Sequence, residues 1–330
     1  SFPYNDTLEA GLLYHKITKQ TKSLEIEILN FVPFDSAVEV MRVRLRNKSK
    51  KEIRFTPTSF IPLYGRSEKC LRDHRHVSAL LNRVYLEKSG IYLKPTMIFD
   101  EKRHKANEMI YFVLGFEDNG LAPIGQFPSL DYFYGQGDVI KPDAIEKRVR
   151  PVVRESPEFD GKEACAAFRF RERVLKKGQE ISYFLILGIE DKEDNIQEIF
   201  KRFNSPRKIE KGLEETKKYW QGYLSALEFD FGDKDFNNWL TWVKLQPTLR
   251  KLFGCSFLPH FDYGKGGRGW RDLWQDALTL LLTQAGQEAR GFLINNFKGV
   301  RVDGSNATII TKDGEFLSDR NRISRVWMDH

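Results

Sequence analysis

The hydrophobic period of the chain changes once, near Asp191, and the change separates two parts of different structure. Before it, apolar and charged residues alternate, as in residues 24–29 (LEIEIL) and 37–46 (AVEVMRVRLR). Alternation at a period of two is typical of strands with one buried face. After it, apolar residues recur at helical spacing, beginning with residues 194–203. The chain therefore combines a β part with a later α part.

The β part contains two segments that are almost continuously apolar, residues 110–116 (IYFVLGF) and 181–188 (ISYFLILG). Such runs favour strands in the middle of a sandwich. Between a strand that ends at Asn47 and the next at Ile53, residues 48–51 predict a hairpin-like turn. Many strands without intervening helices predict a large antiparallel β-sandwich over residues 1–190.

The α part begins with a predicted helical linker over residues 191–233. Pro206 opens a helix that extends to about Leu227. Residues 234–330 form a second predicted domain, with helices over residues 236–253, 272–283 and 288–297.

Composition excludes several classes of protein. The net charge of +7 comes from 53 basic and 46 acidic residues without a dense basic block, so no nucleic-acid partner is expected. No apolar run reaches the roughly 18 residues of a transmembrane helix. Cys70, Cys165 and Cys255 are far apart and favour a reducing, cytoplasmic setting. His74 and His76 lack a third ligand nearby, so no metal site is predicted.

A glycine-rich, cationic loop leads into a helix at residues 264–276 (GKGGRGWRDLWQD). Four glycines in six positions let the backbone approach a ligand closely. Lys265, Arg268 and Arg271 add positive charge where the free N–H groups of a helix already favour an anion. The loop is therefore a candidate anion site.

Asp272 and Asp276 are four residues apart and share one face of the helix that follows the loop. Asp272 alone is explained equally well by the preference for acids at a helix start. Asp276 stands in an apolar segment and needs a partner, such as an arginine or a ligand hydroxyl. The loop and helix together predict a site for a ligand that is both polar and anionic.

Three polar segments follow, at residues 303–308 (DGSNAT), 319–322 (DRNR) and 325–330 (RVWMDH). Their Ser, Asn, Asp and Arg side chains suit hydrogen bonds to sugar hydroxyls. The same residue types also build turns, and this interpretation stays open.

The order of these features resembles the inverting glycoside phosphorylases of glycoside hydrolase family 94. Residues 269–276 match the family motif Gly-aromatic-Arg-Asp-x-x-Gln-Asp. Residues 267–276, 303–308, 325–330 and 73–83 are most similar to the 1,2-β-oligoglucan phosphorylase branch. The resemblance implies a β-sandwich, a helical linker and the first helices of an incomplete (α/α)6 barrel. Such a part-barrel is expected to expose apolar helix faces.

The resemblance also implies a reaction. Inorganic phosphate attacks the anomeric carbon of a β-linked glucosyl unit, a carboxylic acid protonates the leaving oxygen, and α-glucose 1-phosphate forms with inversion. No cofactor is implied, since phosphate is a co-substrate. The matched positions imply no catalytic residue in this segment, a general acid beyond residue 330, phosphate binding by Lys265 and Arg268, and substrate binding by Trp270, Arg271, Asp272, Asp276, Asp329 and His330.

Two alternatives remain on the same architecture, a β-glucan hydrolase and a non-catalytic carbohydrate-binding protein. An inverting hydrolase needs a second carboxylate to activate water, whereas phosphate is already a nucleophile. The expected partners are a β-glucooligosaccharide, phosphate, and the remainder of the same polypeptide with its catalytic barrel. The β-1,2-linked oligosaccharides are the series with which to probe the sugar partner. A homodimer stays open, and no membrane partner is expected.

Overall fold

The structure is a computed structural model that describes residues 6–65, 75–98, 105–154, 156–253, 268–282, 285–306, 309–310 and 316–317. Two compact units divide the chain, Ser1–Lys217 and Lys218–His330. The domain boundaries predicted at residues 190 and 233 stay predictions.

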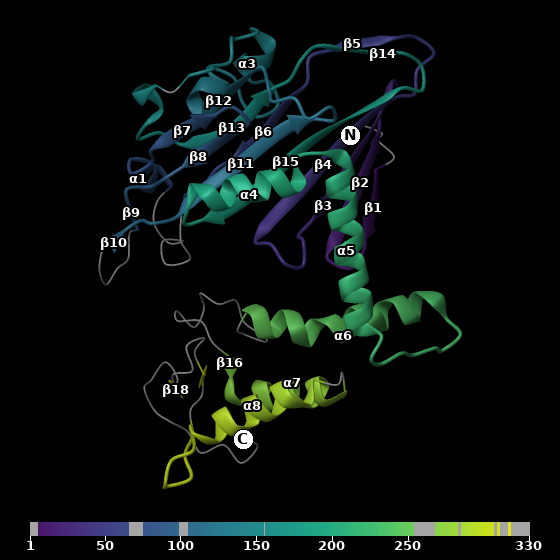
Figure 1. Cartoon of the computed structure of the whole chain (residues 1–330), viewed down its shortest axis with the longest axis vertical. Helices are drawn as coiled ribbons and strands as arrows, with labels where there is room; N and C mark the ends of the chain where they lie inside the picture. The colour runs from purple at the N-terminus through teal and green to yellow at the C-terminus, as the bar shows by residue number, and fades with distance from the viewer. Residues whose placement is uncertain are drawn as a thin grey trace. The chain divides into compact units, whose positions relative to one another are not determined.

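The first unit is built on an eight-stranded antiparallel sheet (Figure 1). β15, the last strand of this sheet in sequence, lies between β4 and β11, so the centre of the sheet joins distant parts of the chain. β11 and β15 are the two continuously apolar segments, and their central place is as predicted. In sheet order the strands are β1 (Thr7–Ala10), β2 (Tyr14–Gln20), β3 (Leu24–Phe31), β4 (Val38–Asn47), β15 (Glu180–Glu190), β11 (Ile110–Glu117), β8 (Gly90–Leu93) and β7 (Val84–Glu87).

A three-stranded sheet packs on one face of the large sheet (Figure 1). It contains β12 (Gly125–Ser129), β13 (Ala164–Arg169) and β6 (Thr58–Pro62). The period of two explains the layers: Tyr111 and Val113 of β11 enter the core between the sheets, while Phe112 and Leu114 enter the core on the opposite face. Two short pairs complete the strands of this unit, β5 (Ile53–Phe55) with β14 (Arg173–Leu175) and β9 (Met97–Ile98) with β10 (Lys105–Ala106).

Helices cover the outer faces of both sheets. α4 (Glu193–Phe203) and the first part of α5 (Pro206–Leu224) place Ile196, Phe203 and Ile209 on the large sheet. α2 (Leu130–Tyr134) and α3 (Asp143–Glu146) cover the small sheet, and α1 (Arg75–Ala79) precedes β7. These three short helices between strands differ from the prediction of strands alone.

The predicted hairpin at residues 48–51 is wrong. β4 pairs with β3 and β15, whereas β5 pairs with β14. The cause is Asn47, which is fully buried and whose Nδ2 donates to the carbonyls of Lys51 and Leu175, each at 2.8 Å. The Leu175 bond is a tertiary contact that fixes the turn, and the chain passes from the large sheet to a different pair of strands.

The second unit is helical, with one small antiparallel sheet (Figure 1). Lys244 of α6 donates from Nζ to the Leu224 carbonyl at the end of α5, 2.9 Å away. Large apolar side chains such as Trp239, Leu278 and Phe297 are exposed on its helices. Its further elements are α6 (Lys234–Phe253), β16 (Arg268–Gly269), α7 (Trp270–Leu282), α8 (Gly286–Phe297), β17 (Ile309–Ile310) and β18 (Phe316–Leu317).

None of the helices that the structure describes combines the length and apolar character that crossing a bilayer requires.

Candidate functional site

The glycine-rich loop ends in β16, and the predicted helix begins directly after it as α7. Arg268 lies in β16, and Trp270, Arg271 and Asp272 form the first turn of α7. Asp276 lies on the second turn of the same helix. The predicted relation of Asp272 and Asp276, four apart along one helix, therefore holds in the backbone.

A strand pair joins a later part of the chain to this helix start. β16 pairs antiparallel with β17, with Gly269 opposite Ile309 and Arg268 opposite Ile310. The chain enters α7 just after Gly269 and enters β17 just after residues 303–308. Because the strands are antiparallel, the first residue of β17 lies opposite the residue that directly precedes α7. Two strands that are more than thirty residues apart in sequence thus lie side by side.

Residues 303–305 of the polar segment form a turn. Asp303 Oδ1 accepts hydrogen bonds from Ser305 Oγ at 2.7 Å and from Ser305 N at 2.9 Å. These bonds, the side-chain one first, hold the pKa of the Asp303 carboxyl below its usual value. Gly304 adopts a φ of 78°, which a glycine tolerates without strain. For Asp303 the turn interpretation of the sequence is therefore right, while Ser305 and Asn306 are buried beside it.

The start of α7 packs against the end of α8. α7 and α8 form an antiparallel hairpin, closed by a hydrogen bond from Ala285 N to the Leu280 carbonyl at 2.8 Å. At the other end of the hairpin, the rings of Trp274 and Phe297 meet edge to face, with centroids 5.0 Å apart. The first two turns of α7 therefore lie against the last turn of α8, where sequence analysis singled out no residue.

Three of the predicted site residues, Lys265, Asp329 and His330, lie outside the described residues. So does His74. Within the part of the chain that the structure describes, no three His, Cys, Asp or Glu side chains come together as a metal site would require.

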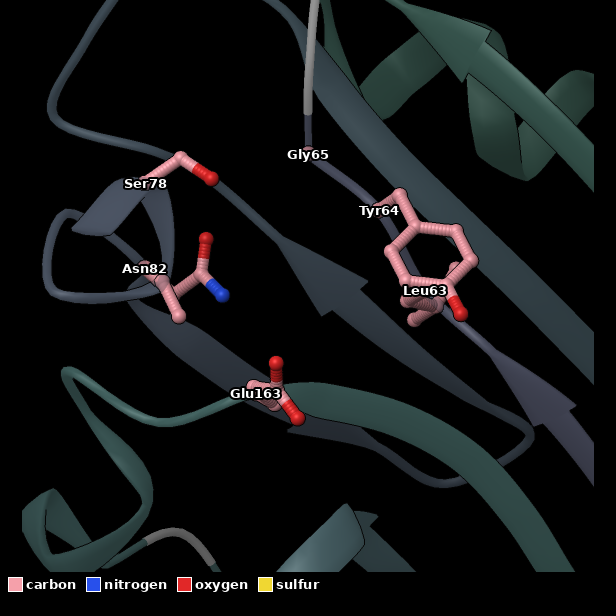
Figure 2. A pocket seen from close by; sticks show the side chains of 7 residues that line it. Leu63, Tyr64, Gly65, Ser78, Asn82 and Glu163 are labelled. Carbon is pink, nitrogen blue, oxygen red and sulfur yellow. The ribbon is translucent and has the colours of Figure 1, made fainter. Parts of the chain in front are cut away.

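A small pocket lies on the first unit, away from these residues in sequence. Figure 2 shows Ser78, Asn82 and Glu163 around one side of it and Tyr64 across from them. Asn82 is anchored, since its Nδ2 donates to the Lys162 carbonyl at 2.8 Å and its own carbonyl accepts from Gly161 N at 3.0 Å. None of the predicted site residues lines this pocket, and one of its polar side chains, Asn82, holds the local backbone in place.

Solved structures similar to this chain include a bacterial glucoamylase complexed with acarbose, with a TM-score of 0.52 at 12% identity. That match covers 96% of this chain and 45% of the glucoamylase. A polysaccharide lyase matches at a TM-score of 0.33 and 8% identity, over 56% of this chain and 22% of the lyase. A putative aldose 1-epimerase from Escherichia coli K12 matches at a TM-score of 0.29 and 10% identity, over 57% of this chain and 68% of the epimerase. The chain thus spans less than half the length of the glucoamylase and of the lyase.

The glucoamylase likeness indicates a shared fold, and the other two scores are too low to support an argument. A search of curated proteins with the sequence gave no match. Residues 5–206 match the family model "Glycosyl hydrolase 94, supersandwich domain". Together these matches confirm the predicted fold class, a large antiparallel β-sandwich with following helices that fit the start of an (α/α)6 barrel. The chain belongs to glycosyl hydrolase family 94, a family of carbohydrate-active enzymes.

Proposed function

We propose that the protein takes part in the reversible phosphorolysis of a β-linked glucooligosaccharide, with α-glucose 1-phosphate as the product. The observation that carries the proposal is the Gly269–Ile309 pairing, which joins the chain at the start of α7 to β17. A cationic loop that leads into a helix bearing Asp272 and Asp276 suits a phosphate held next to a sugar. The family 94 sandwich supports the choice of a carbohydrate substrate.

The roles follow the chemistry of each side chain. Lys265 and Arg268 precede the helix, where its free N–H groups add to their positive charge, and they would bind phosphate. Arg271, Asp272 and Asp276 would bind the hydroxyls of the glucosyl unit, with Trp270, Asp329 and His330 completing that set. We assign the proton donor to none of these residues. The reaction uses phosphate as co-substrate and no cofactor.

The substrate follows from the segments that resemble the 1,2-β-oligoglucan phosphorylase branch, at residues 267–276 and 303–308. We therefore propose β-1,2-linked glucooligosaccharides as the substrate class. The setting proposed is the cytoplasm.

A β-glucan hydrolase is the second candidate, because the glucoamylase that shares the fold is named for a hydrolytic activity. Phosphate dependence separates the two. The full-length protein is incubated with β-1,2-glucooligosaccharides with and without inorganic phosphate, and the sugars are followed by proton NMR. Phosphorolysis gives α-glucose 1-phosphate with phosphate only. Release of free glucose at the same rate without phosphate would refute phosphorolysis and favour the hydrolase.

A further inference from the structure

Three turns of the first unit meet at one end of its large sheet. They connect β2 to β3, β4 to β5, and β14 to β15, at residues 21–23, 48–51 and 176–179. Lys48 N donates to the Ser23 carbonyl at 2.8 Å, which joins the first turn to the second. Gly178 N donates to the Asn47 carbonyl and Asn47 N donates to the Gln179 carbonyl, each at 2.9 Å, which joins the second turn to the third. The buried Asn47 therefore holds distant turns within one small surface, beside the β5–β14 pair (Figure 1).

These turns concentrate positive charge. They contain six lysines and no acidic residue, although the net charge of the whole chain is only +7. All six are exposed: Lys22, Lys48, Lys50, Lys51, Lys176 and Lys177. Among them, and within the described part of the chain, only Lys48 has an ion pair, with Glu25 at 3.6 Å. Glu52 and Glu180 follow the turns directly, and Glu180 lies 3.9 Å from Arg44 instead. An excess of positive charge therefore remains at this surface.

The fold creates this excess from separate runs. Residues 48–51 and 176–177 are more than a hundred positions apart in sequence, so the unfolded chain does not bring their charges together. Gathered ammonium groups repel one another, and water and salt screen only part of the repulsion. The acids of the chain do not neutralise the remainder, whereas a negatively charged partner would. The surface therefore fits a polyanion.

We propose that this lysine surface binds the anionic face of a lipid bilayer. Clusters of four to eight basic residues bind anionic lipids, and each lysine strengthens the binding by about fivefold. The long side chains start from neighbouring turn tips, so their ammonium groups can reach one plane together. Lysine is a compact charge on a flexible stem, which suits a fluid layer of headgroups. The inference is independent of the proposed function, and it replaces the expectation of no membrane partner.

Nucleic acid is the other polyanion to consider. Proteins that bind single strands stack the bases on aromatic side chains, and those that read a duplex use arginine and amide side chains on the base edges. The three turns contain no aromatic residue, no arginine and no large apolar side chain. The composition therefore favours the lipid surface. Binding rests on charge alone and must weaken as salt is added.

The test is cosedimentation of the full-length protein with vesicles of phosphatidylcholine, alone or with phosphatidylserine in equal parts. We expect binding to the anionic vesicles only. The affinity should fall roughly a hundredfold in the triple variant Lys50→Gln, Lys51→Gln and Lys177→Gln. The matched control removes the same charge from exposed lysines elsewhere on the first unit, Lys88→Gln, Lys141→Gln and Lys192→Gln. It should weaken binding by less than about tenfold, because these lysines lie outside the surface.

Equal losses in the two triple variants would overturn the proposal, because net charge alone would then explain the binding. Wild-type protein that binds both kinds of vesicle equally, or neither, would also overturn it. Tighter binding to a DNA duplex than to the anionic vesicles at the same salt would reassign the surface to nucleic acid. Circular dichroism checks the folding of both variants. Should the test variant fail to fold, the wild-type protein must still leave the anionic vesicles as salt is raised, and protein that stays bound would contradict the proposal.

Discussion

The carboxylate of Glu117 is fully buried at the end of β11, and its Oε1 accepts a hydrogen bond from Arg171 Nη1 at 3.0 Å. Arg173 binds the other oxygen, and the backbone N–H of Arg171 donates to Oε1 at 3.2 Å. Both arginines are partly exposed, so the cluster joins a buried anion to two cations that still reach water. This geometry fixes the segment between β13 and β14 against the large sheet.

Glu117→Gln should destabilise the first unit by about 2 kcal/mol, because the arginines lose a charged acceptor that no other group replaces. Urea-induced unfolding measures the change. The matched control is Glu172→Gln, since Glu172 pairs with Arg54 at 2.8 Å on the exposed surface. That pair should contribute less than about 1 kcal/mol. Equal effects of the two variants would contradict a special role for burial at Glu117.

Gly188 of β15 lies opposite Phe112 and Val38 in the sheet. A Cβ at this position would lie 2.6 Å from Phe112 Cζ and 2.8 Å from Val38 Cγ1, closer than packed carbon atoms approach. Gly188→Ala should therefore destabilise the sandwich by about 1–3 kcal/mol. In contrast, Gly291→Ala on α8, where a Cβ meets nothing within 4 Å, should stabilise its helix by about 0.5–1 kcal/mol. Thermal unfolding of both variants gives the comparison, and a stabilising Gly188→Ala would show that the sheet can spread there.

The sequence predicted the parts of the fold that depend on local pattern. The continuously apolar runs of β11 and β15 predicted central strands. A strand with both faces buried is apolar at successive positions, and both faces of β11 and β15 are buried. The failed hairpin at residues 48–51 shows the limit of such reasoning. Turn rules describe four residues, whereas the outcome depended on a bond from Asn47 to Leu175, 128 positions away.

In the candidate site, too, the sequence predicted the features that depend on local pattern and missed those that depend on tertiary contacts. The helix predicted over residues 272–283, which the structure has at Trp270–Leu282, and the shared face of Asp272 and Asp276 follow from spacing. The pairing of β16 with β17 beside that helix start could not be predicted, because a strand of two residues has no detectable period. Asn296 of α8 is buried, whereas a polar residue in a helix normally indicates the solvent side, so its burial could not be predicted.

Burial, followed by the nearby negative charge of Glu87, raises the pKa of the Tyr92 phenol to about 12. The folded state holds this proton more tightly than the unfolded state, where the pKa is about 10. The resulting stability is complete below about pH 10 and is lost as the pH rises toward 12. Tyr92→Phe should therefore flatten the fall in stability between these pH values, at the cost of the bond from Gln197 Nε2 at 3.3 Å. Chemical unfolding at a series of alkaline pH values tests this, and identical slopes for the two proteins would refute it.

Cys165 is a buried free thiol whose Sγ donates to the Phe127 carbonyl at 3.2 Å. Burial raises its pKa far above that of an exposed cysteine, so almost no thiolate exists at neutral pH. The native protein should therefore not be alkylated at this residue by iodoacetamide at pH 8, whereas the protein unfolded in guanidinium should react fully. Peptide mass spectrometry locates the label. Rapid modification of Cys165 in the native protein would show that β13 opens to solvent.

The last prediction separates the two sets of residues in the proposed site. Lys265→Ala and Arg268→Ala remove charge next to the helix N-terminus and should each raise the KM for phosphate by roughly tenfold, with a smaller effect on the KM for the sugar.

Asp276→Asn keeps the shape of its side chain but weakens acceptance from sugar hydroxyls, and should lower kcat/KM for the oligosaccharide by roughly a hundredfold. Initial rates of glucose 1-phosphate formation, with each substrate varied in turn, give these constants. Asp303→Asn is the control, because that carboxylate is already engaged by Ser305 in its own turn and should change stability more than either KM. If the lysine and arginine variants changed only the sugar KM, the cationic loop would have to be reassigned from phosphate to the oligosaccharide.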